Sequence, residues 1–265
     1  MRTRTFFAFV TIFCSMMLSA TAQNKAYLVL EYMHVKPGND AAYIQTENLW
    51  KKMHQQRQKD STILDWNVWA VTLPYDMNAE YQYVVGTVYP SMDAYLNGYA
   101  KVDLHKIFPG LTDDAANSLL TTSAASRDMV RSTVIELLYS DGFNGKATPT
   151  YVLATAMKAT PGKEGDYESL ETKDWGPIHK DLIKNGFESA FSFGRLMFPA
   201  DANSPYNYII FRFFDKATMM DKQDKADWNK YNTANPAAFT NAGTLRTEVH
   251  TELLTKVVSL KDDAK

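Results

Sequence analysis

The segment VKPGNDAAY at residues 35–43 recurs as ATPGKEGDY at residues 159–167, and this repetition decides the fold. In both segments a tyrosine follows the Pro-Gly pair at the same distance, Tyr43 in one and Tyr167 in the other. A Pro-Gly pair ends the preceding element and forms a turn. The same turn is therefore written twice, 124 positions apart.

The similarity extends far beyond the turn. YLVLEYMHVKPG from Tyr27 matches YVLATAMKATPG from Tyr151, and RDMVRSTVIELLYS from Arg127 matches RTEVHTELLTKVVS from Arg246. A repeat of this length is a domain rather than a solenoid unit. We therefore expect two copies of one domain, over residues 23–145 and 146–265, joined through the turn-rich segment SDGFNGKATP.

Each copy has the pattern of strand, helix, two strands, a helical region and a strand, which is the ferredoxin-like βαββαβ order. In the first copy the predicted elements are a strand at 27–35, a helix to about residue 60, strands at 63–73 and 81–89, a helical region at 91–129 interrupted near Pro109-Gly110, and a strand at 130–140. The predicted class is α+β.

The strands are apolar on both faces, as in 81–89 and 206–214. Helices cover only one face of such a sheet, so another layer must cover the second face. The sheet of the other copy is the simplest cover. The sequence therefore predicts an intrachain α+β barrel, built from two tandem ferredoxin-like units.

The first residues have the pattern of a bacterial secretory signal peptide. Arg2 and Arg4 precede an apolar run, and Ala20-Thr21-Ala22 predicts cleavage after Ala22. The only cysteine, Cys14, lies in this segment, so the mature chain has no disulfide. We expect a periplasmic or secreted protein with no membrane segment after signal removal; the oligomeric state is left open.

The charge of the chain argues against one class of partner. The chain has 28 basic and 30 acidic residues without a long basic run, which argues against nucleic acid.

The histidines give no pattern of metal ligands. His250 and Glu252 share a strand face, but their counterparts Arg131 and Thr133 are not ligands, and no HExxH or paired cysteine occurs. We expect no metal site.

The VKPG and ATPG turns, each followed by a helix with an early tyrosine, resemble the dimeric α+β barrel superfamily. The antibiotic-biosynthesis-monooxygenase-like and NIPSNAP-like branches are the most similar in pattern. The resemblance implies small apolar ligands between helix and sheet, and it includes cofactor-free monooxygenases, isomerases and haem-degrading enzymes. Fold alone does not choose among them.

The first helix of each copy carries the main candidate site. Tyr43, Glu47, Trp50 and His54 form one stripe, and Tyr167, Glu171, Trp175 and His179 form its counterpart. The second stripe has one extra residue beside Gly176-Pro177, which a helical bulge would absorb. The predicted ligand-binding residues of the stripes are Trp50, His54, Trp175 and His179, with Tyr81, Tyr83, Tyr206 and Tyr208 from the sheet.

The second copy carries further polar candidates. Arg195, Arg212 and His250 stand where the first copy has Ala70, Thr87 and Arg131. One hypothesis is an anion-accepting cleft bounded by these residues and His179. The alternative is an internal ion bridge from an arginine to Glu31 in the first copy, because an unpaired buried charge is costly.

Three functions remain open. The first is binding of a small apolar or aromatic ligand without turnover. The second is cofactor-independent oxidation or isomerisation of a small aromatic substrate, with His54 or His179 as base. The third is a scaffold whose own side chains fill its pockets. We expect no cofactor; haem on His54 or His179 is the alternative, and both first strands lack the asparagine that the haem-degrading branch uses there.

Overall fold

The computed structural model describes residues 25–76, 78–98, 102–143, 147–201 and 203–261. The predicted signal peptide at residues 1–22 lies outside the described residues. Within the described part, no helix is long and apolar enough to cross a membrane.

The first half of the chain follows the predicted element order closely. Its elements are β1 (Ala26–His34), α1 (Asp40–Lys59), β2 (Asp65–Leu73), β3 (Tyr83–Tyr89), α2 (Met92–Leu96), α3 (Leu104–Ile107), α4 (Asp113–Ser126) and β4 (Asp128–Asp141). The predicted interruption near Pro109-Gly110 separates α3 from α4.

The second half has the same order with a more broken helical region. Its elements are β5 (Tyr151–Ala159), α5 (Glu164–Ser169), a π-helical segment (Leu170–Trp175), α6 (Gly176–Lys184), β6 (Ala190–Phe198), β7 (Tyr208–Phe214), α7 (Ala217–Met220), a 3-10 turn (Gln223–Lys225), α8 (Trp228–Ala234), α9 (Pro236–Leu245) and β8 (Arg246–Ser259).

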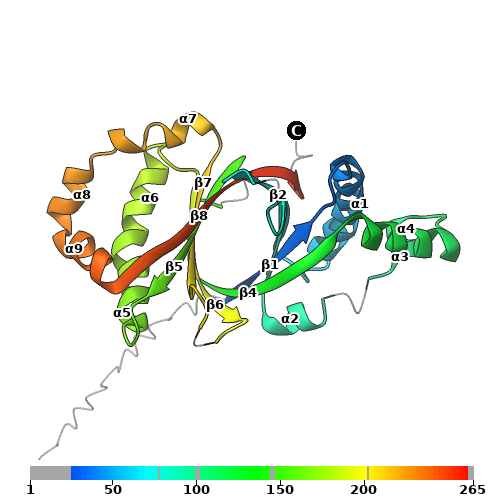
Figure 1. Cartoon of the computed structure of the whole chain (residues 1–265), viewed down its shortest axis with the longest axis horizontal. Coiled ribbons are helices and arrows are strands. Elements are labelled where there is room, and N and C mark those ends of the chain that lie inside the picture. Colours follow the sequence, from blue (N-terminus) through cyan, green and yellow to red (C-terminus); the bar gives the residue numbers. More distant parts are fainter. Residues whose placement is uncertain (1–24, 77, 99–101, 144–146, 202, 262–265) are drawn as a thin grey trace, which may run out of the picture.

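The eight strands form one closed antiparallel barrel in the order β1-β3-β2-β8-β5-β7-β6-β4. Each half supplies four neighbouring strands, and the halves join where β4 pairs with β6 and where β2 pairs with β8. Closure leaves no free sheet edge. Helices α1, α3 and α4 cover one outer side, and α5, α6, α8 and α9 cover the other (Figure 1).

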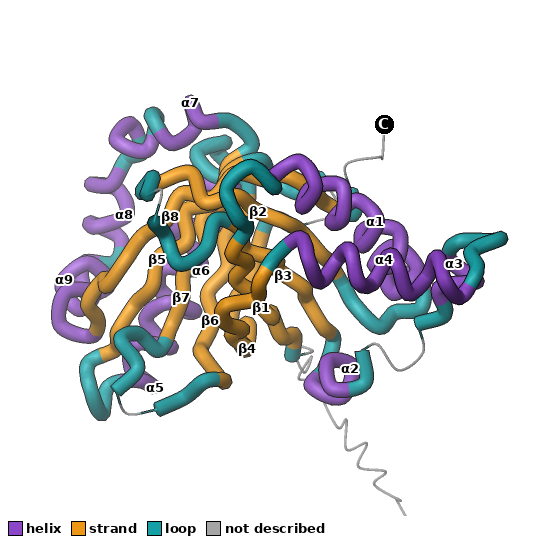
Figure 2. The backbone as a smooth tube through the Cα atoms, turned by 45° about the vertical axis from the view of Figure 1, so that its right-hand side comes forward, coloured by secondary structure: helices purple, strands orange, loops and turns teal. Residues whose placement is uncertain are grey.

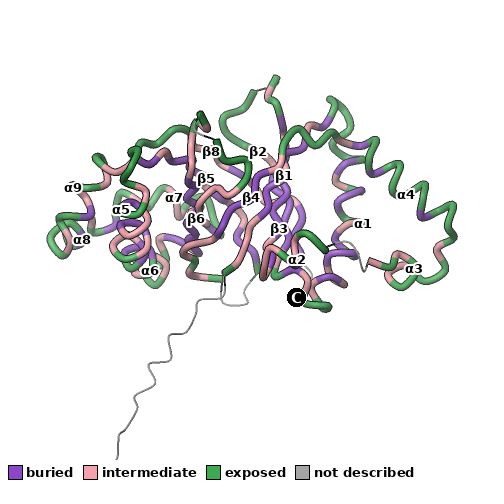
Figure 3. The backbone as a smooth tube through the Cα atoms, turned by 90° about the horizontal axis from the view of Figure 1, so that it is seen from below, coloured by how far each residue is buried: buried purple, intermediate pink, exposed green. Residues whose placement is uncertain are grey.

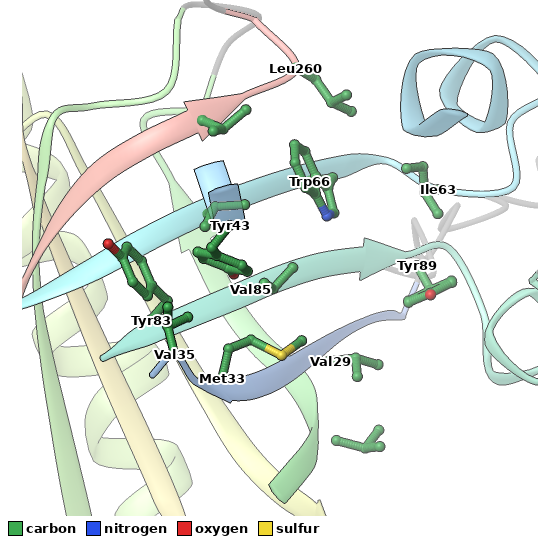
Figure 4. Packing of buried hydrophobic residues seen from close by; sticks show 13 residues of the cluster. Val29, Met33, Val35, Tyr43, Ile63, Trp66, Tyr83, Val85, Tyr89 and Leu260 are labelled. Atoms are coloured by element: carbon green, nitrogen blue, oxygen red, sulfur yellow. The ribbon is translucent and has the colours of Figure 1, made fainter. Parts of the chain in front are cut away.

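Strand alternation divides the core into layers. On the outer face of the first-half sheet, Trp66, Val85 and Tyr83 pack with Tyr43 of α1 (Figure 4). On the inner faces, side chains of both halves meet, among them Val84 and Phe211. Burial is concentrated in the strands, whereas α4 is exposed along most of its length (Figure 3). The prediction that each sheet has helices on one face and the other sheet on the opposite face is confirmed.

The first helix of the second half absorbs its extra residue in the π-helical segment Leu170–Trp175. A π-helix has a wider turn than an α-helix, so it accommodates one residue more over the same length. Tyr167, Glu171 and His179 consequently remain buried on one face. The predicted local bulge is confirmed.

Candidate functional site

A cleft of about 470 Å³ opens between α1, α4 and the outer face of the first-half sheet. We call it the first-half cleft. Helix α4 lies beside α1 rather than flat on the sheet (Figure 2), and this placement leaves the space open. Its lining residues are Glu31, Met33, Glu47, Trp50, His54, Trp66, Val85, Leu120, Ser123, Ala124, Arg127, Asp128 and Met129.

Helix α1 supplies one wall of the cleft through the predicted stripe. The Trp50 indole donates from Nε1 to Ser123 Oγ of α4 at 2.6 Å. The His54 ring stacks on Trp66 of β2, with ring centres 4.7 Å apart. Trp50, His54 and Trp66 therefore form an aromatic wall held from both the helix and the sheet.

Two carboxyl groups line the same cleft. Glu47 is 2 % exposed, and its Oε1 lies 3.3 Å from Nε of Arg127. Burial raises the pKa of Glu47 to about 7, although the Arg127 charge opposes the shift. Burial also raises the pKa of Glu31, again against Arg127. Two carboxyls and one guanidinium thus face the aromatic wall.

The second half repeats part of this arrangement. Glu171 is 1 % exposed, and its Oε1 lies 3.3 Å from Nε of Arg246. Burial raises the pKa of Glu171 to about 7 as well. However, Phe239 of α9 packs on Trp175 with ring centres 5.0 Å apart. The matching position of the first half, 119 residues earlier, is Leu120, which lines the open cleft.

His179 and Arg212 meet at one carboxylate. His179 Nδ1 lies 2.8 Å from Oε2 of Glu188, and Arg212 Nε donates to Oε1 of the same group at 2.8 Å. Burial lowers the pKa of His179, so the ring is neutral and donates its proton to Glu188. The His179 ring also stacks on Phe191 at 3.7 Å. The side chains of His179 and Arg212 are therefore both engaged by partners within the protein.

Arg195 forms a bridge between the halves, but not with the expected partner. Its Nη2 donates to Glu136 of β4 at 2.6 Å, and its Nη1 donates to Glu168 at 2.8 Å. Glu31 lines the first-half cleft instead. The expected bridge to Glu31 is wrong because β6 closes the barrel against β4, which brings Glu136 opposite Arg195.

The sheet tyrosines point to opposite sides of the barrel wall. Tyr83 donates to Asp40 of α1 at 2.8 Å, and Tyr208 donates to Glu168 at 2.9 Å, so both lie on helix-covered faces. Tyr81 and Tyr206 line a separate cavity inside the barrel, together with His250.

The expectation that Tyr81 and Tyr206 join Tyr83 and Tyr208 in lining a site between helix and sheet is wrong. Strands β3 and β7 begin only at Tyr83 and Tyr208. Tyr81 and Tyr206 precede the strands, so the alternation of side chains along a strand does not determine their direction. At the intervening positions, Gln82 Oε1 and Asn207 Oδ1 accept backbone N–H bonds at 2.9 Å.

The anion-accepting cleft expected in the second half is also wrong. His250 lines the barrel interior, whereas His179, Arg195 and Arg212 bond to carboxylates on the helix-covered side. Inner and outer faces of one barrel wall cannot bound a single cleft.

Sequence reasoning missed several residues that line the first-half cleft, namely Trp66, Leu120, Ser123 and Arg127. For Arg127 the sequence did contain an indication, because Arg127 and Arg246 begin the two matching tail segments. Among the described residues, no group of three His, Cys, Asp or Glu is placed to hold a metal ion.

No family model matches the sequence, and no curated protein matches it either. Solved structures share its fold. A candidate monooxygenase from Lactobacillus acidophilus NCFM aligns with TM-score 0.55 and 11 % identity, over 89 % of this chain and 96 % of that one. A double mutant of chlorite dismutase from Candidatus Nitrospira defluvii aligns with TM-score 0.51 and 8 % identity, over 89 % and 93 %. The fold is of the dimeric α+β barrel type.

Proposed function

We propose that this chain is an exported protein that binds a small aromatic molecule in the first-half cleft. The observation that carries the proposal is the open space beside Trp50 and Trp66, into which Glu31, Glu47 and Arg127 bring polar groups. Apolar walls with a few converging polar groups are typical of small-molecule sites.

The polar groups favour a hydroxylated aromatic ring as the ligand. The partly exposed Trp50 indole offers a flat apolar surface, and the carboxyl groups accept hydrogen bonds from phenolic hydroxyls. Arg127 offers donors to a carbonyl or phenolate oxygen on the same molecule. A purely aliphatic ligand would make no use of these polar groups.

The enzyme alternative rests on the pKa of Glu47. A carboxyl that titrates at about 7 transfers protons efficiently at neutral pH, which suits cofactor-independent isomerisation or oxidation of a small aromatic substrate. His54 suits the role of base less well. Arg57 donates to its Nδ1 at 3.0 Å, which leaves the ring proton on Nε2.

Haem fits the two histidines poorly. The Arg57 guanidinium can only donate, so His54 carries its ring proton on Nε2 and offers no lone pair there. His179 has the reverse tautomer, with Nδ1 bonded to Glu188, but it lies beside Trp175, where Phe239 packs on the indole. The arrangement therefore favours an organic ligand over haem.

The scaffold alternative suits the second half better than the first. Phe239 occupies the space beside Trp175, whereas Leu120 leaves the first-half cleft open at about 470 Å³. We accordingly place the ligand in the first half and assign a structural role to the second.

The remaining proposals concern origin and location. Matching element order in the halves and the recurring Tyr-Glu-Arg groups support a tandem duplication of a ferredoxin-like unit, with domains at 23–145 and 146–265. The sequence pattern of each unit is that of the antibiotic-biosynthesis-monooxygenase-like or NIPSNAP-like branch of the dimeric α+β barrel superfamily. Export to the periplasm or medium predicts Gln23 as the mature N-terminus in a mass spectrum, and an intact Met1 would contradict it.

The binding proposal is tested by calorimetric titration with 2-naphthol. We expect saturable binding to the native protein and its loss in Leu120→Phe, which copies the residue of the second half into the cleft. Glu31→Thr copies Thr155 and should weaken binding about tenfold, the typical effect of losing one hydrogen bond to a charged group.

The matched control is Trp175→Phe, the counterpart of Trp50→Phe in the filled half. It should bind 2-naphthol like the native protein, whereas Trp50→Phe binds it more weakly. Unchanged affinity in a folded Leu120→Phe variant would rule out the first-half cleft. If turnover of an aromatic substrate is found, Glu47→Gln, which keeps a hydrogen-bond acceptor, should abolish turnover and weaken binding no more than Glu31→Thr does.

A further inference from the structure

The geometry points to a second ligand site, inside the barrel, for an elongated apolar molecule that ends in a carboxylate. The barrel encloses a cavity of about 400 Å³ lined by residues from all eight strands. It lies on the inner faces of the sheets, whereas the first-half cleft lies on an outer face. The two sites are therefore independent.

The cavity arises from an asymmetry between the halves. Phe211 and Phe213 of β7 project into the barrel, and the residues 125 positions earlier are Gly86 and Val88 of β3. A Cβ at Gly86 would lie 3.5 Å from Leu28 Cδ1, an ordinary contact. The second half thus fills its share of the interior with aromatic rings, and the first half leaves its share open.

One end of the cavity carries a cation without an ion-pair partner among the described residues. Arg127, Arg195, Arg212 and Arg246 each form an ion pair with a glutamate. Arg131 instead lies over the Tyr32 ring at 4.1 Å and donates to the Tyr81 hydroxyl at 3.2 Å. Its guanidinium therefore retains donors for a ligand.

The neighbouring acid is already engaged. Glu252 Oε1 accepts from the Tyr81 hydroxyl at 2.5 Å, and His250 Nε2 lies 3.3 Å from the same oxygen. Tyr206 adds a further hydroxyl to this end. A carboxylate placed here would meet Arg131 and Tyr206 as donors, which is the pairing that guanidinium geometry favours.

The opposite end holds a polar atom that lacks a partner. Asn67 is buried and lines the cavity, and its Oδ1 has no hydrogen bond among the described residues. Its strand partner is Ser259, seven residues beyond Glu252 in β8, or roughly 23 Å along a strand. Between the two ends the wall is apolar, with Leu30, Trp69 and Leu254. This length and polarity fit a chain-like acid.

The test is calorimetric titration of the full chain with decanoate below its micelle concentration, with decanol as the neutral match. We expect one decanoate per chain and weaker binding of decanol. Arg131→Met should lower decanoate affinity about tenfold and leave decanol affinity unchanged. Gly86→Leu should abolish binding of both, at an unchanged or higher Tm.

Leu120→Phe serves as the control for the other site and should bind decanoate like the native protein. If Gly86→Leu does not fold, Val88→Phe, which copies Phe213, takes its place. The proposal is overturned if the native protein does not bind decanoate saturably, if a folded filling variant still binds it, or if Arg131→Met changes both affinities equally.

Discussion

Glu47 and Glu171 hold matching positions in the two halves, each buried beside a tyrosine and an arginine. The buried hydroxyls of Tyr43 and Tyr167 interact with these carboxyls, and each tyrosine ring lies under an arginine at 5.8 Å. Burial raises the pKa of each carboxyl against the pull of its arginine. A buried charge without full hydrogen bonding is unfavourable, so the native state favours the protonated acid.

This pKa shift predicts a pH-dependent stability. Both folded-state pKa values are about 7, above the usual 4.5, so the native protein binds more protons than the unfolded chain between these values. The resulting stability is fully present below pH 4.5 and is lost as pH rises through 7. In Glu47→Gln/Glu171→Gln, the difference in urea midpoint between pH 5.5 and pH 8 should shrink.

Asp114→Asn, an exposed change of the same charge in α4, is the control and should keep the native pH dependence. An undiminished difference in the double glutamine variant would show that these carboxyls are already ionised at pH 5.5.

Among the elements, the first helix of the second half packs closely against β4 of the first half at Gly176. An added Cβ at Gly176, the first residue of α6, would lie 2.7 Å from the Tyr139 ring of β4. Gly165 in α5 has nothing within 4 Å of such a Cβ. We expect Gly165→Ala to raise the Tm, since alanine favours the helix by up to about 1 kcal/mol, and Gly176→Ala to lower it. A rise in both variants would show that β4 is not in contact there.

The elements show what a sequence can and cannot predict. Strands apolar on both faces predicted the closed barrel, and one extra residue in the second stripe predicted the bulge at Leu170–Trp175. The opposite directions of Tyr81 and Tyr83 could not be predicted, because they depend on where β3 begins. The open first-half cleft depends on the placement of α4 beside α1 and on Leu120 standing where the second half has Phe239. Arg195 meets Glu136 only through the register of β4 and β6.

At the scale of the whole molecule, the two halves are inseparable parts of one sheet. Each half provides a strand to the other at both joints, and the inner faces share one hydrophobic core. Disruption of one half therefore removes the edge partners and half the interior of the other. The shared strands and shared core therefore make the two halves one cooperative unit.

We therefore predict that damage to the second half unfolds the first half with it. Leu182→Ala removes a fully buried side chain of α6 at a cost of about 2–5 kcal/mol. In a Trp69→Phe/Trp175→Phe/Trp228→Phe background, the remaining Trp50 and Trp66 lie in α1 and β2, so their fluorescence follows the unfolding of the first half. Adding Leu182→Ala should lower the urea midpoint of this signal as much as the midpoint seen by circular dichroism. A first-half midpoint that stays fixed while circular dichroism shows a separate, earlier transition would mean that the halves fold independently despite the closed barrel.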